Sequence, residues 1–155
     1  MQLNLQELFD RAIIRELVPD AESIVIALHQ PSWDDKLNRG SKSTFNKPNK
    51  SASRLAVLSL ETILENFKNQ IGGGQTPILG YGIITVEAIK SIGRESESAV
   101  EFEVTVDPLP ENPAHAEIIP YEQGKKSIKG RVPNGICSKL LKAMDEYSIS
   151  GQKVS

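Results

Sequence analysis

The chain has 155 residues, of which 39% are hydrophobic and 25% charged, and this composition is typical of one soluble globular domain. Its longest apolar run, residues 24–28, is too short to span a membrane, and a net charge of −2 excludes a general attraction to nucleic acid. The single cysteine excludes an internal disulfide and a multi-cysteine metal site. With no secretory signal visible at the start, we expect a cytoplasmic protein. We also expect that it holds no metal and no cofactor.

The first third of the chain predicts a helix, a strand and a long loop. Apolar side chains recur at helical spacing over residues 3–17, and the β-branched run after them predicts a buried strand that ends near His29. Residues 31–53 then form a long basic loop. We expect partial anchoring of this loop by Trp33 and Phe45, because a disordered segment has little use for large aromatic side chains.

Two strand–helix pairs follow the loop. A short strand over residues 54–58 leads to a helix capped by Ser59. A second strand around residues 83–84 leads to a helix that is capped by Thr85 and closed by Gly93. Both helices are amphipathic, so each is expected to pack on the sheet with one face.

The clearest strand is "AVEFEVTVD", residues 99–107, and residues 114–121 alternate in the same way. Antiparallel pairing of the two would make one apolar face of valines, Phe102, Ala116 and Ile118. The opposite face would carry Glu101, Glu103, Thr105, His115 and Glu117. A last helix, capped by Asn134, completes the predicted elements.

These short, interspersed elements predict an α+β fold. We expect a single domain over residues 1–150, with a small, mainly antiparallel sheet, about four helices packed on it, and a C-terminal tail at residues 151–155.

Proline is concentrated in "DPLPENPAHAEIIP", residues 107–120, which holds four of the nine prolines. Each proline fixes φ, and the residue before a proline is held in an extended conformation. Asp107 and Asn112 both precede a proline. The sequence therefore predicts a stiff connection into the strand that begins near His115, which would serve a binding surface as well as the fold.

Several blocks resemble a family of small, uncharacterised bacterial proteins: "LHQPSW", "SKSTFNKP", "RLAVLS", "YGIITVEAIKSIG" and, most specifically, "DPLPENPAHAEI". The family pattern has a His-Pro pair where this chain has His29, Gln30 and Pro31. The resemblance implies no particular activity. It does imply that His29, Ser43, Phe45 and His115 mark one shared surface.

Charge is unevenly distributed. Residues 36–54 carry six basic residues and no acid, and so do residues 123–143. If the two segments meet on one face, they would attract an anionic or nucleotide ligand. Lys42 and Arg54 are the predicted anion-binding side chains.

The candidate catalytic residues are His29, His115 and Glu117. His115-Ala116-Glu117 looks like a fragment of a zinc deaminase, but that chemistry needs two further cysteines, which the chain lacks. Two histidines at predicted strand ends suit proton transfer near neutral pH. This predicts an enzyme on a nucleotide or phosphate-containing substrate, either phosphoesterase-like or ADP-ribosyltransferase-like.

The leading hypothesis from the sequence is a cytosolic binding or accessory protein, for example in a multi-protein, mobile-element or defence-associated system, and the enzyme is its alternative. Its partner would be another protein rather than a membrane. Its contact surface would be built from the basic loop, with Trp33, Phe45, Lys42 and Arg54, and from the stiff connection that contains Asn112.

Overall fold

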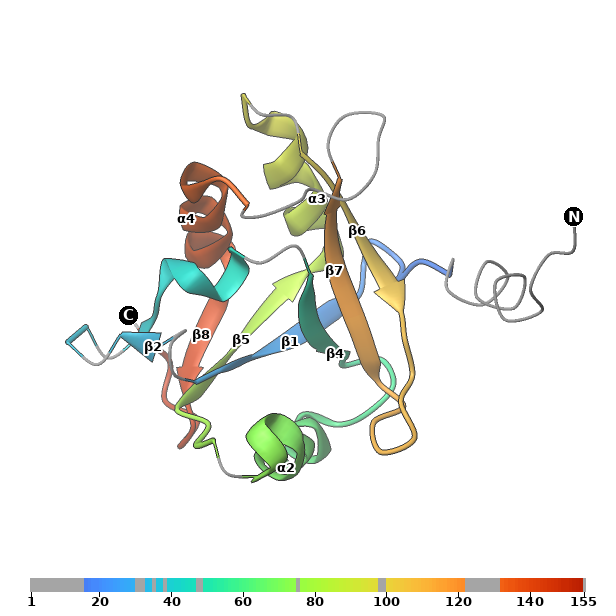
Figure 1. The fold of residues 1–155 in the computed structure, drawn as a ribbon, viewed down its shortest axis with the longest axis vertical. Coiled ribbons are helices and arrows are strands. Elements are labelled where there is room, and N and C mark those ends of the chain that lie inside the picture. The colour runs from blue at the N-terminus through green and yellow to red at the C-terminus, as the bar shows by residue number, and fades with distance from the viewer. Residues whose placement is uncertain are drawn as a thin grey trace, which may run out of the picture.

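The computed structural model describes residues 16–29, 33–34, 36–37, 39–46, 49–74, 76–97, 100–121 and 132–154. These residues form an α+β fold built on a six-stranded antiparallel sheet with the strand order β6-β7-β4-β1-β5-β8 (Figure 1). The sheet strands are β1 (Ser23–Leu28), β4 (Lys50–Arg54), β5 (Gly80–Thr85), β6 (Glu101–Val106), β7 (His115–Tyr121) and β8 (Asp145–Ser148).

Helices cover both faces of the sheet, with α2 on one face and α3 and α4 on the other (Figure 1). They are α2 (Leu60–Gln70), α3 (Val86–Glu95) and α4 (Asn134–Ala143). The described part of the chain thus has three α-helices rather than about four, and the helix predicted over residues 3–17 lies outside it except for its last two residues. Within that part, no helix is long and apolar enough to cross a membrane.

The apolar run of β1 has a clear cause, because β1 is a central strand covered on both faces. Ile24, Ile26 and Leu28 belong to the core cluster on the side of α3 and α4. Val25 and Ala27 belong to the second cluster, which includes residues of α2. A strand buried on both faces has no polar positions, which explains why "IVIAL" does not alternate.

The predicted pairing of the two alternating strands is confirmed. β6 and β7 are antiparallel, with Val104 opposite Ile118 and Val106 opposite Ala116. Phe102, Val104, Ala116 and Ile118 are buried in the cluster under α3 and α4. Their neighbours therefore face the α2 side of the sheet, where α2 itself packs on β1 rather than on β6 and β7.

Two of the three predicted helix caps are confirmed. The Ser59 hydroxyl accepts a hydrogen bond from Thr62 N at 3.2 Å, and the Thr85 hydroxyl accepts one from Ala88 N at 3.2 Å. The prediction for Asn134 is wrong, because α4 begins at Asn134 itself and its N-cap is Pro133, with no side-chain cap bond.

The predicted loop over residues 31–53 contains more structure than its composition indicates. It includes a small hairpin, β2 (Trp33–Asp34) with β3 (Arg39–Gly40), then the 3₁₀ helix η1 (Lys42–Phe45), and finally β4. The strand predicted over residues 54–58 instead ends at Arg54, and residues 55–58 form a turn or bend. "KSASR" reads as a loop because it is small and polar, yet β1 and β7 both pair with it and make it a strand.

Other chain segments run along both edge strands. Val18 N donates to Val104 O at 2.8 Å beside β6, and Val154 N donates to Glu146 O at 2.9 Å beside β8. β8 itself follows α4 directly and was not predicted from the sequence. This partial cover reduces the exposed backbone that edge strands would otherwise offer for aggregation.

Candidate functional site

A pocket of about 480 Å³ opens on the α2 side of the sheet. Its floor comes from the end of β1 and from β4, and its walls come from the last turn of α2 and from residues 109–115. The lining mixes hydroxyl, amide and imidazole groups with the apolar side chains of Phe67, Ile71 and Leu109. A concave site of this size with a few convergent polar groups is typical of small-molecule binding.

His29 and His115 both line this pocket. His29 follows the last residue of β1, and His115 is the first residue of β7. They lie 86 positions apart in the chain, and β4 brings them together because it pairs with both β1 and β7. The structure therefore answers the question that the sequence left open, namely whether the two histidines share a cleft.

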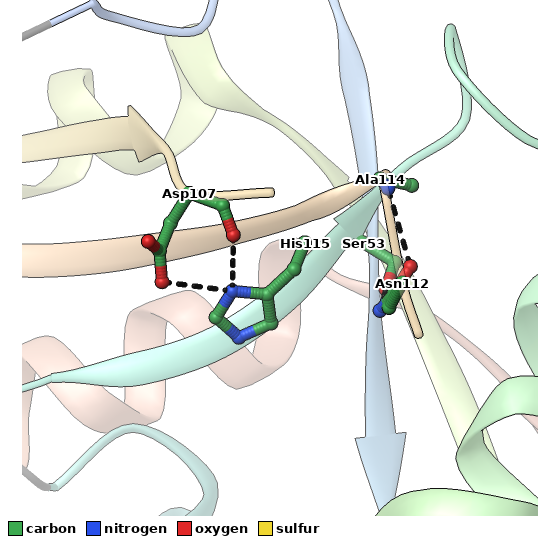
Figure 2. A network of polar contacts seen from close by, with 5 residues as sticks. All are labelled: Ser53, Asp107, Asn112, Ala114 and His115. Atoms are coloured by element: carbon green, nitrogen blue, oxygen red, sulfur yellow. Dashed lines mark hydrogen bonds and ion pairs between the residues drawn. The ribbon is translucent and has the colours of Figure 1, made fainter. Parts of the chain in front are cut away.

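The imidazole of His115 is held by Asp107 (Figure 2). Its Nδ1 lies 2.9 Å from the backbone carbonyl oxygen of Asp107 and 3.1 Å from the carboxylate oxygen Oδ2. A carbonyl oxygen only accepts hydrogen bonds, so Nδ1 carries the proton and donates it. In the neutral ring Nε2 then keeps its lone pair, and Figure 2 shows this atom on the side of the ring away from Asp107. Only 11% of the His115 side chain is exposed.

Asn112 locks the connection that carries His115 (Figure 2). Its Nδ2 donates to the Ser53 hydroxyl at 3.1 Å, and its Oδ1 accepts from Ala114 N at 3.2 Å. The side chain is almost fully buried, and these bonds tie the 107–114 connection to β4. Asn112 was predicted as a ligand-binding residue, but both ends of its amide are used inside the protein.

Ser53 is a site residue that sequence reasoning missed. It is buried, lines the pocket, and lies directly opposite His115 in the β4–β7 register. Its segment, "KSAS", was interpreted as part of the loop over residues 31–53, and it carries no sequence signal for a strand. Among the described residues His115 has no hydrogen bond to a hydroxyl, and the Ser53 hydroxyl accepts a hydrogen bond from Asn112 Nδ2.

Glu117 lies two residues after His115 on the same face of β7. Asp107, His115 and Glu117 each offer one ligand atom, and these atoms lie within 4.8 Å of one another. The residue types suit a divalent cation. However, Nδ1 already donates to the Asp107 carbonyl, and a cation bound at that nitrogen would displace this hydrogen bond.

Three of the other predicted binding residues are placed away from the pocket. Trp33 and Phe45 are buried in the core on the side of α3 and α4, so neither is an exposed anchor for a partner. Arg54 forms a bidentate pair with Glu22, with Nη2 2.7 Å from Oε2 and Nε 2.9 Å from Oε1. The hydrogen bond to Glu22 raises the pKa of Arg54, and this pair occupies the guanidinium that was predicted to hold an anion.

The surface implied by the family resemblance is brought together only in part. His29 and His115 share the pocket, whereas η1, which carries Ser43 and Phe45, packs against α4 on the opposite face of the sheet. The Lys42 side chain and most of the second basic segment, residues 123–131, lie outside the described residues.

Comparison with family models, with curated proteins and with solved structures finds no match to this chain.

Proposed function

We propose that the protein is an enzyme that binds a small polar molecule in this pocket and exchanges a proton with it through Nε2 of His115. The observation that carries the proposal is that His115 lines the pocket while its Nδ1 is held by Asp107. His29, on the same pocket wall as the end of β1, is the second candidate for proton transfer or for orienting the ligand.

The contacts of Asp107 suit a positioning residue. The bond from Nδ1 to the backbone carbonyl fixes the ring tautomer, and a backbone oxygen in a paired segment cannot rotate away. When Nε2 accepts a proton the ring becomes an imidazolium, and the Asp107 carboxylate, 3.1 Å from Nδ1, attracts that charge. The stiff, proline-containing connection holds Asp107 and His115 in register, since Asp107 N donates to His115 O at 3.0 Å.

The accessory-protein hypothesis receives less support, because both of its predicted aromatic anchors are core residues. A phosphoesterase-like or ADP-ribosyltransferase-like activity stays within the proposal as one possible chemistry. The described residues contain no further sequence motif that is typical of either activity.

The proposal is tested with a fragment library that includes mononucleotides, screened by thermal shift and ligand-observed NMR. We expect fragments that bind the wild type to lose binding in His115→Ala, and to keep it in Arg94→Ala, a matched control on α3 across the sheet.

A second measurement reports the proton directly. ¹⁵N NMR of the imidazole should show a protonated Nδ1 and an unprotonated Nε2 in the neutral ring, and ligand binding should perturb Nε2. A ring protonated on Nε2, or pocket fragments that ignore His115→Ala, would overturn the proposal.

A further inference from the structure

The acidic side chains that the structure describes near the pocket gather around His115. Glu111 lines the pocket, and the carboxylates of Asp107 and Glu117 lie beside His115 without lining the pocket. β6 adds Glu103, which lies on the same face of the sheet as His115. Within the described residues the carboxylates of Glu103 and Glu117 form no ion pair.

The backbone adds to this potential. The C-terminal end of α2 forms one wall of the pocket through Phe67, Gln70 and Ile71. The last carbonyl groups of a helix carry a partial negative charge, which favours cations. The helix end and the carboxylates therefore act in the same direction.

Among the described residues, Lys50 is the only lysine or arginine in the pocket lining. Lys50 borders the pocket, but the alternation along β4 puts it on the face of Ala52, a core residue under α3 and α4, while Ser51 and Ser53 face the pocket. Arg54 is committed to Glu22. The described lining contains no arginine, the side chain that binds a phosphate with two parallel hydrogen bonds.

We infer that the occupant of this pocket carries a positively charged group, such as an ammonium or amidinium, beside His115 and Glu117. Its hydrocarbon part would lie against Ile71 and Leu109, two half-buried apolar side chains of the lining. This inference rests on the proposed function, since it assigns a ligand class to the same pocket, and it replaces the anionic ligand that the basic segments predicted.

The test uses three probes of matched size and different charge, namely benzylamine, benzyl alcohol and benzoate, together with AMP and MnCl₂. Binding to the full chain is followed by two-dimensional NMR. We expect benzylamine to bind most tightly, with a dissociation constant in the millimolar range, and to weaken at high salt because an ion pair contributes.

Two substitutions localise the charge. Glu117→Gln should weaken benzylamine about tenfold, the effect of one partly buried ion pair. Glu101→Gln, an exposed carboxylate at the far end of β6, should change the affinity less than about twofold. The inference fails if AMP or benzoate binds more tightly than benzylamine, if Glu117→Gln has no effect, or if no probe binds.

Mn²⁺ distinguishes the two sources of positive charge. Paramagnetic broadening centred on residues 107–117 and lost in Glu117→Gln would identify a metal ion as the cation. The absence of such broadening, with benzylamine bound, would identify an organic cation. If fragments that depend on His115 are neutral or anionic, the ligand class assigned here is wrong while the proton-transfer function stands.

Discussion

Asn112→Ala probes the contact that fixes the site to the sheet. The substitution removes the bond to the Ser53 hydroxyl and the bond from Ala114 N, and both partners are buried. A buried polar group left without a partner costs about 1 to 3 kcal/mol, so the two together should lower the free energy of unfolding by about 3 kcal/mol. For a domain of this size, that loss corresponds to a fall in Tm of roughly 6 to 12 °C.

The measurement is urea unfolding followed by circular dichroism, with Ser53→Ala and the double substitution completing a cycle. Ser53→Ala leaves the Asn112 amide without its acceptor, so the double variant should be less destabilised than the sum of the two single variants. Asn112→Asp is the matched control, because it keeps the acceptor for Ala114 N and should be milder than alanine. A loss below about 0.5 kcal/mol for Asn112→Ala, or strict additivity in the cycle, would show that this contact does not hold the connection.

Two further predictions concern the core. Gly93→Ala should destabilise the protein by about 3 kcal/mol although alanine is the better helix former, because the new Cβ would lie 2.3 Å from the backbone oxygen of Val100. Gly82→Ala should destabilise it by only about 1 kcal/mol, because the new Cβ meets the flexible side chain of Met144. Chemical denaturation measures both losses, and equal losses would contradict this difference. Burial raises the pKa of Tyr81 above its ordinary value, so folding favours the neutral phenol. The stability that Tyr81 contributes is therefore present below about pH 10 and is lost as the pH rises further. Tyr81→Phe should therefore flatten the decline in stability above pH 10 relative to the wild type, and parallel pH profiles would refute this assignment.

Local patterns in the sequence determined much of the fold because their physical causes are local. Alternation predicted β6 and β7 and the face that each residue takes, since successive side chains in a strand point to opposite sides. Ser59 and Thr85 predicted two helix starts, since a cap bond needs only residues three positions apart. The class of the fold, α+β with an antiparallel sheet, followed from these elements.

Only the tertiary structure decided the site. "KSASR" becomes a strand because β1 and β7 supply partners on both sides, and no pattern within five small or polar residues announces those partners. Trp33 looked like an exposed anchor in a polar loop, yet the hairpin β2–β3 turns it into the core. The pocket itself is assembled from the ends of β1 and α2, from β4, and from the connection before β7, segments that are distant in the chain. The residue types at this site could be read from the sequence, whereas their shared cleft arises from strand order.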